Sequence, residues 1–424
     1  MSSNEHPLDG GWSAWSQVGA AFLISFCTMG LGNSFGAFQA YYEQNTLESY
    51  SESEISWIGT TQGFLLSLGG FFSGPLYDKG DIKILVYTGT VLSVVGLLST
   101  SFAERYYSTI LSFGVTVGVA CGAMYVPAQA MISTHFESRA SLAQGISMAG
   151  TNVGGIIYPI LVRQLEDKIG FSWACRVFAL MNGVMLTTAC LLIKPRRKRP
   201  GEIKHFHWQT FRNWKLLLFG GCALLLNVGV DVPFFFVPTI VLYKLNLPPE
   251  VGDSLLAGLN ASSLLGRIFL NWVAGKIKPI NVWQFTIFAA CILFFCWFLI
   301  GDLAGMIVFI IFYGFLVGGL ISLIPRSLQC IFPDEADFGA RLGLIEALQG
   351  IGFLVGPPIA GEILMSPASY LGVSIFFGLI YFTLFMLVGV FTWQKFDGKP
   401  SRDEEASLDD EPLSVLYRVA AREG

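Results

Sequence analysis

Long apolar stretches alternate with short polar segments along almost the whole chain. A stretch of roughly 20 apolar residues can span the hydrocarbon core of a bilayer as a helix. Twelve stretches meet that length, at residues 15–41, 55–76, 84–102, 108–132, 142–165, 171–193, 216–243, 252–273, 282–300, 304–332, 342–365 and 371–393. The pattern therefore predicts an all-α membrane protein with twelve transmembrane helices, divided into two halves of six.

The polar segment between the halves fixes the expected orientation. Residues 194–214 hold seven basic side chains: Lys194, Arg196, Arg197, Lys198, Arg199, Lys204 and Arg212. Short loops rich in Lys and Arg stay on the cytoplasmic side of a membrane, and the apolar flanks argue against a nuclear-localisation patch. Because each half has an even number of spans, both termini are expected in the cytoplasm.

This pattern divides the chain into five regions. They are a cytoplasmic N-terminus (1–14), an N-terminal six-helix bundle (15–193), the basic cytoplasmic loop (194–214), a C-terminal six-helix bundle (215–394) and an acidic, disordered cytoplasmic tail (395–424). The first residues lack the basic and apolar regions of a cleavable signal peptide. We expect the first span itself to direct insertion.

Composition supports the membrane assignment and excludes several functions. The chain is 53% hydrophobic and 13% charged, whereas roughly 25% charged residues is usual for soluble domains. The eight cysteines lie in apolar runs without metal-ligand spacing, so they are expected to be packing residues. Neither a Walker A sequence nor a catalytic motif occurs. We therefore expect no enzyme activity, no cofactor, no metal and no nucleic-acid partner.

Two motifs carry a resemblance to a known family. Residues 9–15 read DGGWSAW, which resembles the entry motif of the monocarboxylate-porter family within the major facilitator superfamily. The segment that starts at His135 resembles that family's loop into the fifth helix, and it matches at Phe136, Arg139, Leu142, Ala143, Gly145, Ala149, Gly150, Gly154 and Pro159. Residues 232–238 and 356–361 are similar to the fungal branch. The resemblance implies two pseudo-symmetric six-helix bundles around a central cavity, working by alternating access.

The chain departs from that family at two positions. Members that carry lactate with a proton have a lysine in the first helix, where this chain has Asn33. They also have an aspartate one turn before the eighth-helix arginine; the arginine matches Arg267, but Ser263 replaces the acid. Lactate-type proton coupling therefore does not carry over directly.

Ionisable residues within a span are candidates for function, because they need a cavity or a partner. Arg267 is either a counter-ion for an anionic substrate or a structural arginine that anchors a loop. Asp231 is either a proton-coupling carboxylate or a structural aspartate. Glu346 is a second proton-coupling candidate, with an interfacial ion pair or gate as its alternative. Pro233 and Pro238 in the seventh span and the pair Pro357 and Pro358 in the eleventh are expected to break their helices locally.

Uncharged polar residues at mid-depth are the other substrate-binding candidates: Asn33, Asn152, Tyr125, Gln129 and Asn260. Each of these residues alone could instead form an ordinary hydrogen bond between helices. At the cytoplasmic end, Asp78, Lys79 and Arg139 are expected to form a gate or latch, unless they only mark the topology.

These features together predict a secondary transporter for a small organic acid or related metabolite. We expect a monomer in the plasma membrane that binds a small-molecule substrate, an organic anion, and contacts the lipid bilayer. The absence of the lactate-type Lys and Asp favours efflux. A proton-coupled importer of a monocarboxylate or vitamin is the alternative. A membrane sensor that signals through the C-terminal tail is an alternative of another class.

Overall fold

The computed structural model describes residues 11–136, 139–194, 212–333, 337–365 and 369–394. Most of the predicted cytoplasmic N-terminus, almost all of the basic loop and the acidic tail lie outside the described residues. Within them the chain is almost entirely helical, and no strand is present there. The all-α fold predicted from the sequence is confirmed.

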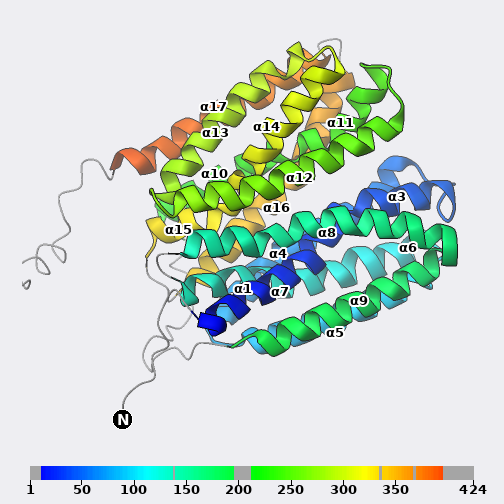
Figure 1. The fold of residues 1–424 in the computed structure, drawn as a ribbon, viewed down its shortest axis with the longest axis horizontal. Coiled ribbons are helices and arrows are strands. Elements are labelled where there is room, and N and C mark those ends of the chain that lie inside the picture. The colour runs from blue at the N-terminus through cyan, green and yellow to red at the C-terminus, as the bar shows by residue number, and fades with distance from the viewer. Residues whose placement is uncertain (1–10, 137–138, 195–211, 334–336, 366–368, 395–424) are drawn as a thin grey trace, which may run out of the picture.

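The first helical group comprises residues 11–192 (Figure 1). Its elements are α1 (Gly11–Ser25), the π-helical turn η1 (Phe26–Gly30), α2 (Leu31–Asn33), α3 (Phe35–Gln44), α4 (Glu52–Asp78), α5 (Ile82–Thr100), α6 (Tyr106–Thr109), the π-helical segment η2 (Ile110–Val117), α7 (Gly118–His135), α8 (Ala140–Ile169) and α9 (Phe171–Leu192). Elements α1 to α3 follow one another as a single irregular span, as do α6, η2 and α7.

The second group, residues 214–394, packs beside the first (Figure 1). It comprises α10 (Trp214–Val230), α11 (Val232–Tyr243), α12 (Pro249–Ala274), α13 (Pro279–Cys296), the 3-10 turn η4 (Trp297–Leu299), α14 (Leu303–Ser322), α15 (Ile324–Ile331), α16 (Phe338–Met365) and α17 (Ser369–Gln394). Elements α10 and α11 form one broken span, and α14 and α15 form another.

Ten helical segments of the described chain are long and apolar enough to cross a membrane. Helices α4 and α12 are of comparable length but are not among those ten. Both are rich in Gly and Ser, and each packs against a helix of the other group, α4 on α16 and α12 on α8. They therefore exchange part of their lipid contact for contact with protein, which explains their lower apolar content.

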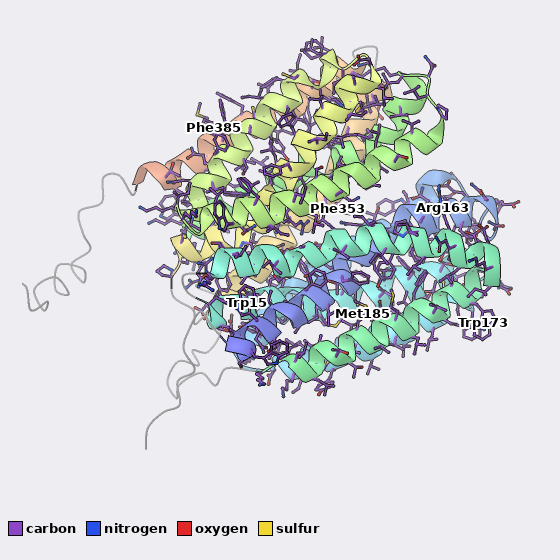
Figure 2. All side chains as sticks on the ribbon, in the orientation of Figure 1. Trp15, Arg163, Trp173, Met185, Phe353 and Phe385 are labelled. Carbon is purple, nitrogen blue, oxygen red and sulfur yellow. The ribbon has the colours of Figure 1, made fainter. Side chains whose placement is uncertain are left out.

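Glycine allows the helices of the two groups to approach closely. A Cβ added at Gly74 of α4 would overlap the carbonyl oxygen of Gly339, and one at Gly343 of α16 would overlap the carbonyl oxygen of Gly70. Further along the same pair, a Cβ at Gly63 would lie 3.1 Å from the ring of Phe353, whose side chain lies between the two groups (Figure 2). Small residues at such interfaces let two backbones pack closely.

Replacing Gly343 with valine is expected to force α4 and α16 apart. Overpacking of this kind costs about 1–3 kcal/mol, so the closed packing should be depopulated by roughly 5-fold to 100-fold. Hydrogen exchange of the α4 and α16 peptides should become faster. Gly221→Ala is the matched control, because a Cβ there meets nothing within 4 Å. Equal exchange in both variants would contradict the close approach.

The predicted helix break is present near Pro233 and absent at the other prolines. The seventh span is broken at Asp231, between α10 and α11 and two residues before Pro233. By contrast, α11 continues through Pro238, and α16 continues through Pro357 and Pro358, without interruption. A proline removes one backbone donor, and neighbouring helices can satisfy the freed carbonyls. Proline alone therefore does not fix a break.

Candidate functional site

Arg267 lies at the centre of the contact between the two groups of helices. It projects from α12 and is only 4% exposed. Its Nη1 donates a hydrogen bond to the backbone oxygen of Met148 on α8, at 2.9 Å. Its Nε has no hydrogen-bond partner among the described residues. A buried guanidinium with an unused donor can bind a further oxygen atom, and carboxylates fit this geometry well.

The structure brings two other predicted residues near Arg267 and a third near one of these two. Asp231, at the break between α10 and α11, and Tyr125 of α7 both interact electrostatically with Arg267. Glu346 of α16 in turn interacts with Tyr125. Neither carboxylate forms a direct ion pair with Arg267. Nearby groups therefore interact with the guanidinium charge, but neither carboxylate is ion-paired with it. The guanidinium is thus available to bind an anion.

Two asparagines extend the polar site along the contact between α8 and α12. Asn152 Nδ2 donates to the backbone oxygen of Asn260 at 3.1 Å, and Asn260 Nδ2 donates to that of Leu256 at 3.2 Å. The Oδ1 atoms of both asparagines are buried and have no partner among the described residues. An unpaired buried polar atom costs about 1–3 kcal/mol. A ligand or water that donates hydrogen bonds here would remove that cost.

Ser263, which stands where the lactate-carrying relatives have an aspartate, belongs to this site. It is 1% exposed, and its hydroxyl has no partner within the described part of the chain. Asn260, Ser263 and Arg267 are spaced three and four residues apart, so they share one face of α12. That spacing is the signal that could have identified Ser263 beforehand.

Asn33 borders the same region from the first span. A Cβ added at Gly155 of α8 would lie 3.4 Å from Asn33 Cβ and 3.5 Å from Asn260 Oδ1. The absence of a side chain at Gly155 therefore leaves room beside both asparagines. Asn33 itself is exposed and follows the π-helical turn η1, an irregularity that is frequent at functional sites.

Gln129 is the candidate that the structure places elsewhere. Its Nε2 donates to Ser25 Oγ at 2.9 Å, and its Oε1 accepts from Gln144 Nε2 at 2.7 Å and from Ser147 Oγ at 3.2 Å. All of these partners lie within the first helical group. The side chain joins α1, α7 and α8, and in this conformation its amide is occupied by protein contacts.

The break at Asp231 is stabilised by two tyrosines. Pro233 has no N–H to donate to the carbonyl of Gly229 four residues earlier. The Tyr313 hydroxyl donates to the Val230 oxygen at 3.0 Å, and the Tyr381 hydroxyl donates to the Leu226 oxygen at 3.1 Å. Both tyrosines also interact electrostatically with Asp231. The break is therefore a defined feature that presents Asp231 next to polar groups.

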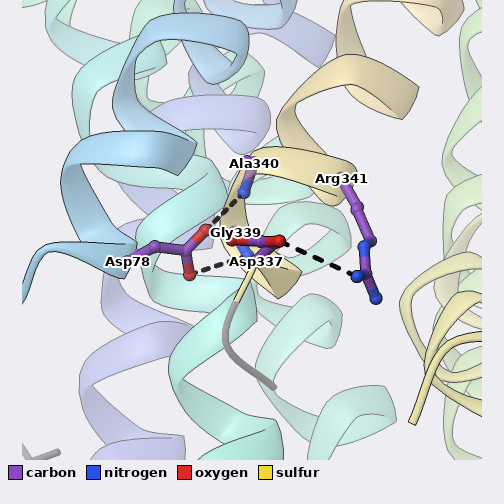
Figure 3. A network of polar contacts seen from close by, with 5 residues as sticks. All are labelled: Asp78, Asp337, Gly339, Ala340 and Arg341. Carbon is purple, nitrogen blue, oxygen red and sulfur yellow. Dashed lines mark hydrogen bonds and ion pairs between the residues drawn. The ribbon is translucent and has the colours of Figure 1, made fainter. Parts of the chain in front are cut away.

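Asp78 joins the two groups at one end of the molecule, which we call the latch end (Figure 3). Its Oδ1 accepts from the Gly339 N–H at 3.0 Å, and its Oδ2 accepts from the Ala340 N–H at 2.7 Å. These N–H groups belong to the first turn of α16, where backbone donors lack helical partners and the helix dipole favours negative charge. The carboxylate therefore caps a helix of the other group.

The other two latch candidates do not take part in this cap. Lys79 is exposed at the end of α4. Arg139 is exposed at the start of α8, beside the end of α12. Arg139 therefore lies at the contact between α8 and α12, whereas Asp78 lies at the contact between α4 and α16.

The chain is similar in sequence to known transport proteins. Residues 18–333 match the family profile described as Major Facilitator Superfamily. The chain is 36% identical over 371 residues to the "MFS-type transporter pynF" of Aspergillus niger, with 86% of this chain and 85% of the relative covered. It is 33% identical over 371 residues to the "Aspyridones efflux protein apdF" of Emericella nidulans, covering 87% and 75% of the two chains.

Solved structures share the fold at low sequence identity. The outward conformation of the transporter FucP superposes with a TM-score of 0.69 and 13% identity, over 91% of this chain and 99% of that one. The human organic anion transporter MFSD10 superposes with a TM-score of 0.65 and 11% identity, over 89% and 98%. At these identities the likeness extends to the fold alone.

Proposed function

Because the chain belongs to the Major Facilitator Superfamily, we propose that it is a secondary transporter of the monocarboxylate-porter type that exports an organic anion, a secondary metabolite. The buried Arg267 carries this proposal, since its Nε and the neighbouring oxygens of Asn152, Asn260 and Ser263 are unpaired among the described residues. Together these atoms offer one charged donor, two amide acceptors and a hydroxyl to a polar solute.

Efflux is supported by the relatives. The name of one relative assigns it the export of aspyridones, and another relative, from Paecilomyces divaricatus, is named "Agnestins efflux protein AgnL12" and is 32% identical over 366 residues. Two aromatic side chains fit a solute with a ring system: Phe235 is 51% exposed, and its ring centroid lies 6.3 Å from that of Phe353, which lies between the two groups of helices (Figure 2). A solute with one acidic group and an aromatic or apolar body would suit both the polar site at Arg267 and the aromatic pair.

In the proposed mechanism, the Asp78 cap and the glycine contacts form when the two groups of helices close at the latch end and break when they separate there. Alternating access requires the two groups of helices to separate at one end while they close at the other. We assign the latch end to the cytoplasmic side, with both termini, and propose that the protein works as a monomer in the plasma membrane. Opening the latch end breaks the cap on α16 and uncovers the site from the cytoplasm.

Comparing metabolites in cells with and without this gene tests the proposed function. Loss of the gene should cause one acidic metabolite to accumulate inside the cell and to fall in the medium. The identified compound should then move saturably in vesicles that contain the purified protein. Identical metabolite profiles, together with no flux of any candidate anion in vesicles, would reject the proposal.

Asp231 is our first candidate for coupling transport to protons, with Glu346 as the second. Asp231→Asn keeps the shape of the side chain but cannot bind and release a proton. We expect it to remove the stimulation of flux by a pH gradient while exchange of solute for solute continues. Both rates can be measured in vesicles, with the exposed Asp167→Asn as the control. Retained stimulation in Asp231→Asn would move the coupling role to Glu346.

A further inference from the structure

A groove runs along the outer surface where the two groups of helices meet. It has a volume of about 550 Å³ and is lined by Leu142 of α8, by Leu265, Ile268, Phe269 and Trp272 of α12, and by Phe315 of α14. All of these side chains are apolar. Leu265 is 63% exposed and Phe269 is 50% exposed. In a membrane this groove faces the lipid and not the candidate substrate site, which is buried on the other side of α12.

A second cavity continues from the groove toward the latch end. It has a volume of about 350 Å³, shares Leu142 and Trp272 with the groove, and adds Trp15, Arg139, Gly275 and Lys276. Trp15 lies on α1 in the first helical group (Figure 2). The Lys276 Nζ lies 3.7 Å from the centroid of the Trp272 ring. Two cations and two tryptophans therefore meet at one end of an apolar channel, and among the described residues no carboxylate lines either cavity.

This arrangement matches the parts of a phospholipid molecule. An acyl chain fits an all-apolar groove that faces hydrocarbon, and tryptophan is favoured at the level of the lipid headgroups. Basic pockets between transmembrane helices on the cytoplasmic side attract anionic headgroups. We propose that these two cavities form one binding site for an anionic glycerophospholipid of the cytoplasmic leaflet, with its phosphate at Lys276 and Arg139 and one acyl chain along α12.

The site spans the boundary between the two groups of helices, which gives the lipid a regulatory role. Leu142, Arg139 and Trp15 belong to the first group, whereas Lys276 and the rest of the groove belong to the second. Separation of α8 from α12 at the latch end would divide the site. A ligand that binds one conformation better shifts the population toward it, so the bound lipid stabilises the latch-closed state. This role does not depend on which solute is transported.

Lipid titration of the purified full-length protein tests the site. We would add dioleoyl phosphatidylserine or dioleoyl phosphatidylcholine and measure binding by native mass spectrometry. Phosphatidylserine should bind more tightly, and Lys276→Gln should weaken it about fivefold, as expected for one basic residue near an anionic lipid. Lys83→Gln is the matched control, since Lys83 is exposed at the start of α5 and lines neither cavity.

A second variant tests the apolar part of the site without changing its charge. Leu265→Trp fills the groove at a lipid-facing position and should also weaken phosphatidylserine binding. Glycerophosphoserine, the headgroup without acyl chains, should compete poorly. Equal affinities of Lys276→Gln and Lys83→Gln would overturn the proposal. Full competition by glycerophosphoserine with no effect of Leu265→Trp would overturn it as well, by showing a site for a free phosphate ester.

Discussion

Replacing Arg267 with glutamine is expected to abolish saturable transport of the anionic substrate. The side chain is 4% exposed and contacts α8 from α12, so glutamine loses a charge that no other described residue supplies at this position. Truncating one partner of a buried charge pair costs about 2–5 kcal/mol, which corresponds to roughly a 30-fold to 4,000-fold loss of affinity or rate. Uptake into inside-out vesicles, with protein content matched, measures this loss.

Arg267→Lys separates charge from geometry. Lysine keeps the positive charge but lacks the planar fork that binds a carboxylate at two points, so partial activity with a raised KM is expected. Ser263→Ala removes a hydroxyl one turn away on the same face and should weaken binding by a smaller factor. Unchanged flux in Arg267→Gln, with normal amounts of protein in the membrane, would show that Arg267 is a structural residue.

The sequence pattern was sufficient to predict the long helices. Hydrophobic length identified every long helix, including α4 and α12, because even these less apolar helices lie between clear polar turns. Isolated charges within apolar runs also directed attention to Arg267, Asp231 and Glu346, since burying a charge is too costly to occur without a role.

The rotation of each helix about its axis could not be predicted in the same way. Gln129 and Asn152 both lie within long apolar helices and have similar amide side chains. Gln129 faces Ser25 and Gln144 within its own group, whereas Asn152 faces Asn260 of the other group. One sequence contains no information about which neighbour a polar face meets, so both residues gave the same prediction.

The latch shows a second limit of sequence analysis. Asp78 was a candidate because it ends an apolar span beside a basic residue, and Lys79 was chosen with it. The partners of Asp78 are backbone N–H groups 261 and 262 residues further along the chain. Every residue except proline has such a group, so no side-chain pattern could identify them. Lys79, the next residue in the sequence, is exposed and takes no part in this cap.

Asp78→Ala is expected to open the latch end. The substitution removes both acceptors from the Gly339 and Ala340 N–H groups and the charge from the start of α16. Hydrogen bonds to charged groups contribute about 1.5–3 kcal/mol each, and a charge at a helix N-terminus contributes about 0.3–1 kcal/mol. Together these contributions amount to about 3–7 kcal/mol, which would reduce the latch-closed population roughly 100-fold or more relative to the open one.

Distance measurements between spin labels would detect this shift. Labels on cysteines introduced at the exposed Lys79 and Lys278 report on the two groups at the latch end, after replacement of the exposed Cys296 and the partly exposed Cys330. The label separation should increase in Asp78→Ala, and transport should fall because the protein no longer closes at this end. Asp81→Asn is the control, since Asp81 is exposed in the same turn and makes no side-chain cap. If Asp78→Ala and Asp81→Asn gave the same separation, the cap on α16 would not hold the two groups together, and closure would depend on the glycine contacts alone.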